Sequence, residues 1–352
     1  MRRLCFCLMV LFILPVLISS CSLGAEDPLV PEPEDEEETT IVESYEEKEV
    51  EEEKPEILAA EFLSGKFVSE TEIEFYFSFP VTILSLSFDP PLETGPAENG
   101  SEVKVILDEI PEPGLRFSAS IEAEDEWENL ITAQITLFAQ NNKVPNLQIN
   151  ELRTEYSKPR AEFIELKILS DGNLGAIRVF AAGNNAAPLI YQFPPVEVSE
   201  GEYVVLHLRT LEEGLCVDEI GEDLAESGGT DSCPSARDFW IPQSVKLLRK
   251  TDAVYVMDQD DNVLDAVMIS ETPDAAWGKE YLASAASFLF AKGAWKSPSG
   301  TMCQPVDAVD SSGIKTSATR SISRDEELEN SKTAADWHIT EIGGATPGLP
   351  NK

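Results

Sequence analysis

Apolar residues recur at every second position in several short runs of this 352-residue chain. The run EIEFYFSF at residues 72–79 alternates charged or small residues with Ile and Phe, and VTILSLSF at residues 81–88 alternates again after Pro80. An alternation of period two is typical of a strand with one buried face, and proline ends a strand because it has no backbone N–H. The pattern therefore predicts two strands that Pro80 separates.

Further runs of the same kind lie at residues 103–107, 115–121 and 130–138, with Pro, Gly, Asn and Asp between them. Short strands at this spacing predict a β-sandwich over residues 57–145. The FSFPV strand ending, the Pro113-Gly114 turn and the turn at residues 125–129 resemble bacterial immunoglobulin-like domains of surface proteins. That resemblance implies a stalk or an adhesive module.

A second set of motifs begins after residue 146. The motifs are LQINELRTEYSKPRAEFIEL at 147–166, GEYVVL at 201–206, DAVYVMDQDDNVLDA at 252–266, AADW at 334–337 and TPGLPN at 346–351. In this order they resemble the lamin-tail domain of bacterial secreted proteins. The resemblance implies a second β-sandwich over residues 146–352 with an insertion near residues 211–242. The predicted fold class is all-β: two tandem immunoglobulin-like β-sandwiches after a signal peptide and a disordered acidic linker.

The ionisable residues of these motifs have structural explanations. Three glutamates lie in the first two strands expected in this region, and three arginines offer partners for them; these are Glu151, Glu162 and Glu165, with Arg153, Arg160 and Arg324. We expect ion pairs or carboxylates that accept from backbone N–H groups, rather than a catalytic pair of carboxylates. Trp337 is expected to fill the core rather than to bind a ligand.

The N-terminus predicts export and lipidation. Two arginines precede a 15-residue apolar run, which is too short to span a bilayer and therefore predicts a signal peptide over residues 1–20. Ile18-Ser19-Ser20-Cys21 resembles the lipobox of bacterial lipoproteins, which implies cleavage before Cys21 and acyl chains such as palmitate on that residue. An ordinary secretory signal with a chance cysteine is the alternative. Ser22, which follows the cysteine, resembles the sorting signal for the outer membrane. We therefore expect the protein in the cell envelope, with the outer membrane favoured and its periplasmic or surface face undetermined.

Acidic residues dominate the charge of the chain. The sequence holds 65 Asp and Glu against 26 Lys and Arg, a formal net charge of −39. Nucleic acid is therefore excluded as a partner, because binding it requires cations against the phosphates. Residues 26–56 alone carry 16 Asp and Glu with only Lys48 and Lys54, and prolines interrupt them. Like charges repel, so we expect residues 21–56 to be a disordered tether, or alternatively a bait for cations.

Cleavage after Ser20 would leave four of the six cysteines, and Cys21 would be lipidated. Cys216 and Cys233 lie close together in the insertion, and an oxidising exterior favours a disulfide between them. Cys303 would then be unpaired, although pairings of Cys303 with either of the other two stay open. The spacing shows neither a CxxC motif nor a nearby histidine, so the sequence predicts no metal site and no cofactor.

One segment has the beginning of a calcium loop. Asp258, Asp260 and Asn262 follow a D-x-D-x-N pattern, but Val263 and Ser270 replace the glycine and the bidentate glutamate of an EF-hand. A solvated hairpin tip is therefore expected, with cation binding as the alternative. The acidic residues of the insertion are likewise expected to form a polar loop, with cation binding as the alternative.

No catalytic residue emerges from the sequence, which has no GxSxG, P-loop, dinucleotide fingerprint or HExxH. We expect a non-enzymatic, lipid-anchored envelope or surface protein that binds or scaffolds an unknown protein or envelope partner through its lamin-tail-like domain. The alternatives are a calcium- or glycan-binding adhesin, and a metal-dependent hydrolase or nuclease accessory. The membrane itself is a partner through Cys21.

Overall fold

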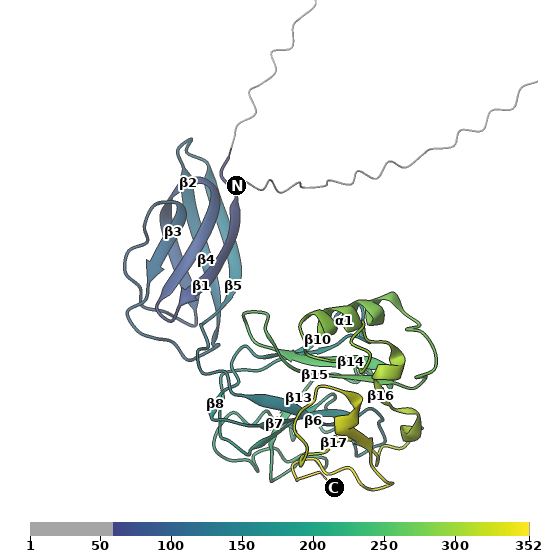
Figure 1. Cartoon of the computed structure of the whole chain (residues 1–352). Helices are drawn as coiled ribbons and strands as arrows, with labels where there is room; N and C mark the ends of the chain where they lie inside the picture. The colour runs from purple at the N-terminus through teal and green to yellow at the C-terminus, as the bar shows by residue number, and fades with distance from the viewer. Residues whose placement is uncertain (1–58, 352) are drawn as a thin grey trace, which may run out of the picture. The chain divides into compact units, whose positions relative to one another are not determined.

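The computed structural model describes residues 59–351 (Figure 1). The predicted signal peptide, Cys21 and the acidic tether lie outside these residues. Regular structure in the described part consists of 18 strands, one α-helix and three 3₁₀ turns, and the sheets have a sandwich-like arrangement. The all-β fold class is thus confirmed. Over residues 59–351, the structure holds no helix with the length and apolarity needed to cross a bilayer.

Five strands form the first β-rich part. They are β1 (Phe62–Ser69), β2 (Glu72–Asp89), β3 (Gly100–Ile106), β4 (Arg116–Asp125) and β5 (Leu130–Phe138). All pairs are antiparallel, in the order β1-β2-β4-β5 with β3 on β2. Their buried side chains, which include Ile73, Phe75 and Phe117, form one apolar cluster between residues 60 and 139.

Pro80 does not end a strand, contrary to the sequence prediction. β2 runs without a break through Pro80 for 18 residues. Residues 72–77 pair with β1 and residues 81–89 pair with β4, while β3 pairs with residues 72–76 and, after an irregularity, with Val81. Pro80 therefore lies at this irregularity, where β2 passes from β1 to β4 and where no residue of β2 has a ladder partner. One long strand thus joins β1 and β3 to β4 within the five-stranded sheet.

The second β-rich part has a six-stranded and a five-stranded sheet. The six-stranded sheet has the order β13-β12-β7-β6-β17-β18, the five-stranded sheet the order β10-β9-β14-β15-β16, and β8 pairs with β11. The strands are β6 (Leu147–Arg153), β7 (Phe163–Ile168), β8 (Gly172–Asn173), β9 (Arg178–Ala181), β10 (Leu189–Gln192), β11 (Glu197–Val198), β12 (Tyr203–His207), β13 (Arg237–Trp240), β14 (Asp252–Met257), β15 (Val263–Ser270), β16 (Val309–Asp310), β17 (Ile322–Arg324) and β18 (Trp337–Ile339).

The main core of this part lies between the two sheets. It combines Leu152, Leu166 and Leu206 of the six-stranded sheet with Val254 and Val267 of the other. A helix that the sequence did not predict, α1 (Glu280–Ala291), packs on β14 and β15 and buries Leu282, Ala286 and Leu289. Short 3₁₀ turns follow at η1 (Pro305–Asp307), η2 (Ser312–Ile314) and η3 (Ala334–Asp336).

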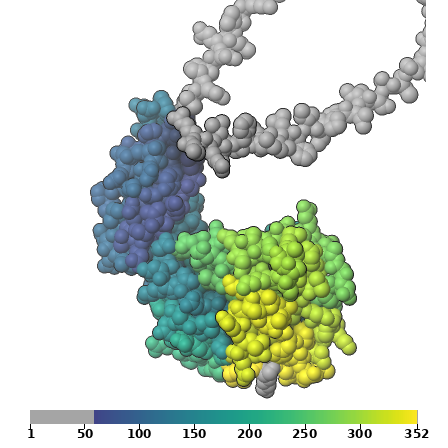
Figure 2. All heavy atoms as spheres, in the orientation of Figure 1, coloured from purple at the N-terminus to yellow at the C-terminus, as the bar shows by residue number. Residues whose placement is uncertain are grey.

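The six-stranded sheet is buried on both faces along β12. All five residues of β12 are buried, which is typical of a strand whose sequence, YVVLH, is almost continuously apolar. Val204 and Leu206 face the main core, while Tyr203 and Val205 join a separate cluster with Phe163, Cys233 and Ala236. The insertion and the C-terminal stretch (yellow in Figure 2) supply the residues that contact this second face.

Candidate functional site

The insertion returns to the sheet as β13, which pairs in parallel with β12. The register places Asp238 opposite Val205 and Trp240 opposite His207. The imidazole of His207 stacks on the indole of Trp240, with ring centroids 3.7 Å apart and an 8° angle between the planes. Parallel pairing thus brings together residues that lie 33 positions apart in sequence.

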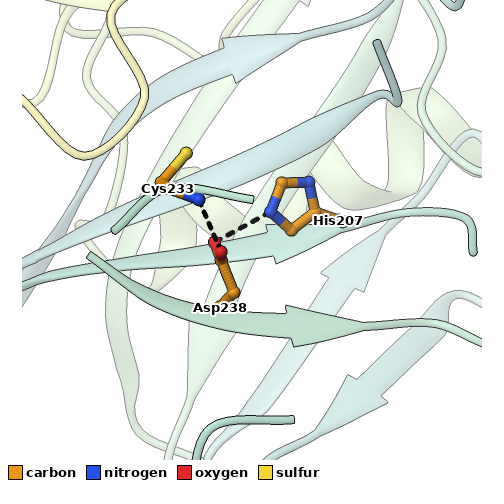
Figure 3. Close-up of side chains that lie close together, drawn as sticks. All are labelled: His207, Cys233 and Asp238. Atoms are coloured by element: carbon orange, nitrogen blue, oxygen red, sulfur yellow. Dashed lines mark hydrogen bonds and ion pairs between the residues drawn. The ribbon is translucent and has the colours of Figure 1, made fainter. Parts of the chain in front are cut away.

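His207, Cys233 and Asp238 form a compact group beneath this strand pair (Figure 3). The imidazole Nε2 lies 2.9 Å from Asp238 Oδ1, and the backbone N–H of Cys233 donates to Asp238 Oδ2 at 2.6 Å. One donor atom from each side chain, namely a ring nitrogen, the Cys233 Sγ and a carboxylate oxygen, lies within 4.8 Å of the others. All three residues are buried.

Asp231 faces the other side of the imidazole. Its Oδ2 lies 3.8 Å from His207 Nδ1 and accepts from the backbone N–H of Ala161 at 2.7 Å. Arg153 Nη1 donates to the same oxygen at 2.9 Å, while the guanidinium covers the ring of Phe163. The His207 Nδ1 atom is buried and has no hydrogen-bond partner among the described residues. Such an unpaired buried atom is uncommon in folded proteins.

The environment of Cys233 disfavours the thiolate form of its side chain. Burial raises its pKa, and the negative charges of Asp238 and Asp231 raise it further. A nucleophilic cysteine requires the opposite, a lowered pKa and access to substrate. The Cys–His–Asp arrangement therefore does not match a cysteine hydrolase, although it contains the same residue types.

The predicted disulfide between Cys216 and Cys233 is not present, and Cys303 is free as well. Cys233 is held beneath the sheet by its N–H bond to Asp238, and its Sγ lies 3.8 Å from the Asp231 carbonyl oxygen. The Cys216 Sγ instead lies against Gly229, where an added Cβ would be 2.6 Å from the sulfur. Cys303 is buried in the main core. Nearness in sequence was therefore a poor guide to pairing.

Sequence reasoning missed His207 as a partner of Cys233 because it looked for a histidine within local motif spacing. The parallel register of β12 and β13 makes the contact instead. One signal was available: a histidine inside the otherwise apolar run VVLHL must be hydrogen-bonded if that run is a buried strand.

Glu151 and Glu165 are buried acceptors of backbone N–H groups, as the sequence predicted, and the donors lie in the C-terminal stretch. Glu151 accepts from the backbone N–H of Thr346 and from the hydroxyls of Ser321 and Ser323. Glu165 accepts from the N–H of Gly348 at 2.6 Å and from Asn150 Nδ2 at 2.8 Å. Burial raises the pKa of Glu165 to about 8, and the nearby charge of Glu151 adds to the effect.

The arginines pair differently from the sequence expectation. Arg324 donates to Asp265 Oδ2 at 2.6 Å and covers the ring of Trp337, which is buried as predicted. Glu162 pairs with Arg209 rather than with any of the three arginines expected. These pairs are internal, so the carboxylates involved are not exposed to a substrate.

Asp258 forms a hairpin tip between β14 and β15, where the sequence predicted one. Its Oδ1 accepts from the N–H groups of Asp260 and Asn262, and its Oδ2 accepts from Asn262 Nδ2, all at 2.9 Å. The Arg178 guanidinium pairs with Asp261 in the same tip. Both oxygens of Asp258 thus serve the turn itself, and a cation already lies beside it.

The tip at Asp125 in the first β-rich part has the same construction. Asp125 accepts from the N–H groups of Trp127 and Asn129 and from Asn129 Nδ2. In both tips the fourth residue, Glu128 or Asp261, has a φ near +60°. The D-x-x-x-N pattern is therefore a turn signature in this chain, and it explains Asp258 without a bound ion.

Comparisons with known proteins locate the relatives of this chain. Residues 145–339, more than half of the chain, match the family TP_1001_2nd, described as a protein second domain. An uncharacterized protein of Treponema pallidum (strain Nichols) is 29% identical over 220 residues, which cover 60% of this chain and 54% of that protein. The chain thus spans about half the length of this curated relative.

Two solved structures show weak likeness. The N-terminal part of the bacterial S-layer protein SbsC has 12% identity and a TM-score of 0.23, with 60% of this chain and 44% of that chain covered. A DUF4876 family protein from Bacteroides thetaiotaomicron VPI-5482 has 13% identity and a TM-score of 0.24, with 79% and 90% covered. At these scores neither structure carries an argument about this chain.

The raised pKa of Glu165 predicts a specific pH dependence. The folded state keeps the proton up to about pH 8, whereas the unfolded chain loses it near 4.5. Unfolding therefore releases a proton between these values, and the free energy of unfolding falls as pH rises, by at most about 1.4 kcal/mol per pH unit. Denaturant titrations of Glu165→Gln across this range should show a flatter dependence. The exposed control Glu213→Gln should keep the wild-type dependence; an unchanged slope in Glu165→Gln contradicts the assignment.

Calcium should leave the melting temperature unchanged, because both oxygens of Asp258 already accept hydrogen bonds from the turn. Asp258→Asn should lower the melting temperature with or without calcium, since it weakens the acceptor. Asp125→Asn is the matched control, because it alters the same turn in the first β-rich part. Thermal melting in calcium and in EDTA measures this. A calcium-induced rise that only Asp258→Asn removes would show a real calcium loop.

Proposed function

This chain belongs to the TP_1001_2nd family. We propose that it is a non-enzymatic, lipid-anchored envelope protein whose second β-rich part binds or scaffolds a partner. One observation carries the non-enzymatic part of the proposal. The carboxylates at the motif positions of this part are buried and bonded to the chain's own backbone or arginines. Carboxylates that are buried and bonded in this way stabilise the fold and are out of reach of a substrate, which supports a non-enzymatic role.

The lamin-tail resemblance is part of the proposal and draws support from these contacts. The motif TPGLPN places backbone N–H groups on Glu151 and Glu165 of the INE and EFIEL motifs. Asn351 completes the closure, because its side chain donates to the carbonyl oxygens of Asn150 and Arg324. The separated motifs thus meet in space and have a common structural role, which supports a module used for positioning.

A basic hollow in the second β-rich part is the surface on which we place the partner. Its volume is about 530 Å³, and its lining includes four cationic residues and one acidic residue: Lys246, Arg249, Lys250 and Lys279, with Glu271. Glu155 and Glu271 pair with two of these lysines, whereas Lys279 is exposed at the beginning of α1. In a chain with a net charge of −39, this local excess of cations over carboxylates favours an anionic group of the partner, such as a carboxylate or phosphate.

The membrane side of the proposal rests on the lipobox-like sequence that ends at Cys21. A protein with two or more acyl chains is stably anchored, and the acidic stretch that follows would repel itself and an anionic membrane surface. The second β-rich part would then reach its partner at a distance from the bilayer. We place the protein in the bacterial envelope and favour the outer membrane.

Cys21→Ala should abolish acylation and release the protein from the membrane, because the thiol is the attachment point for the lipid. Metabolic labelling with palmitate and fractionation of the envelope measure both effects. Ser20→Ala keeps a small residue before the cysteine and is the matched control, which should be labelled like the wild type. Undiminished labelling of Cys21→Ala would refute lipidation at this residue.

Reversal of charge in the hollow should weaken binding of a polyanion. For the pair Lys250→Glu and Lys279→Glu we expect about tenfold weaker binding of soluble heparin, a loss that corresponds to about 1.4 kcal/mol. The pair Lys143→Glu and Lys292→Glu makes the same change in net charge outside the hollow and should bind like the wild type. Calorimetric titration at fixed salt measures this. Equal losses in both pairs would show a general charge effect and overturn the proposed surface.

A further inference from the structure

His207, Cys233 and Asp238 bring together three kinds of metal ligand. Imidazole, thiolate and carboxylate are the side chains that bind Zn²⁺ in proteins, and the combination of sulfur with nitrogen disfavours calcium and magnesium. From the geometry of this group we propose that it binds one zinc ion, which fastens the insertion to the six-stranded sheet. No CxxC motif marks this site, because its ligands come from β12, from β13 and from the turn that precedes β13.

The donor atoms are already near the separation that a zinc ion requires. They lie within 4.8 Å of one another, whereas zinc–ligand distances of 2.0–2.3 Å place tetrahedral ligands roughly 3.5 Å apart. To reach that spacing the widest separation would shorten by up to about 1.3 Å, and the 2.9 Å between His207 Nε2 and Asp238 Oδ1 would lengthen by about 0.6 Å. The ion would take the place of the hydrogen bond between His207 Nε2 and Asp238 Oδ1.

The unpaired nitrogen of His207 fits this site. A histidine that binds metal through Nε2 carries its proton on Nδ1 and usually directs it at a carboxylate. His207 Nδ1 is buried without a hydrogen-bond partner among the described residues, and Asp231 Oδ2 lies 3.8 Å away. Arg153 and the N–H of Ala161 hold Asp231 in place. Asp231 is therefore the residue that orients His207 toward the ion.

The charges of the site balance when zinc is present. Binding converts the Cys233 thiol to a thiolate and releases one proton to solvent, so that Zn²⁺ meets one thiolate and one carboxylate. The sum is zero, and the adjacent Asp231–Arg153 pair is also neutral. A buried site of zero net charge avoids the large cost of an uncompensated charge in the protein interior.

The ligands are enclosed, as at a structural ion, and because the group supplies three ligands a water molecule would take the fourth tetrahedral position. His207, Cys233 and Asp238 are all buried, so the ion would enter while the insertion folds over the sheet rather than by diffusion into the finished protein. The site goes beyond the proposed binding role, since it concerns how the insertion is held and not which partner is bound. It also competes with a Cys216–Cys233 disulfide, because Cys233 cannot serve both.

The test uses the full chain, unfolded in EDTA with reductant and refolded with Zn²⁺, with Co²⁺ or without metal. We expect one zinc per chain by elemental mass spectrometry and a higher melting temperature with zinc than without it. With cobalt, a thiolate-to-metal charge-transfer band should appear. Cys233→Ser should lose this band and the zinc-dependent shift. Cys216→Ser, a thiol of the same insertion outside the group, is the matched control and should keep both.

Asp238→Asn provides a second measurement if Cys233→Ser does not refold. The amide keeps the shape of the carboxylate and can accept from the Cys233 N–H, so the fold should persist while zinc affinity falls at least tenfold. The proposal is overturned if the refolded wild type holds no zinc, if Cys233→Ser binds zinc as the wild type does, or if Cys216→Ser loses binding. A Cys216–Cys233 disulfide in protein isolated from cells would overturn it as well.

Discussion

Buried carboxylates that accept hydrogen bonds from the backbone are the interaction on which the second β-rich part depends. Glu151 and Glu165 lie fully buried in β6 and β7, and their oxygens meet the N–H groups of Thr346 and Gly348. A carboxylate left in the interior without partners destabilises a protein by about 3–5 kcal/mol. The C-terminal stretch therefore stabilises the strands that begin this part, because it supplies donors to their buried acidic side chains.

This dependence explains why the chain has ionisable residues in strands that are buried on both faces. The face of β12 toward the main core is apolar, with Val204 and Leu206, but the opposite face carries His207 beside Cys233 and Asp238. An apolar cover there would bury the second face equally well. A polar cover instead specifies which segment lies where, because each acceptor needs its own donor. The INE and EFIEL motifs supply the acceptors of these contacts, and the TPGLPN motif supplies the donors.

How much of this could be read from the sequence depends on the range of each interaction. The alternation in residues 72–79 and the D-x-x-x-N tip at Asp258 are local, and the structure has a strand and a hairpin there. The prediction at Pro80 was wrong because the proline lies at an irregularity between two paired segments of β2, and a sequence pattern does not show where pairing is interrupted. The Cys216–Cys233 prediction failed and His207 was missed for one reason: the parallel pairing of β13 with β12 is non-local. The helix α1 has three buried residues against β14 and β15, so tertiary contact, rather than a strong local signal, accounts for it.

The acidic residues of the insertion, which the sequence suggested as a polar loop, follow the same rule at the edge of the sheet. β13 is a terminal strand, and an unpaired edge would offer N–H groups to other chains. Asp218 accepts from the N–H of Trp240 at 2.7 Å, and Glu219 accepts from the N–H of Asp238 at 2.7 Å while its own N–H donates to the Asp238 carbonyl oxygen. Two carboxylates thus occupy the positions that a neighbouring strand would fill. Part of the negative charge of this chain therefore closes a sheet edge and is not available to bind cations.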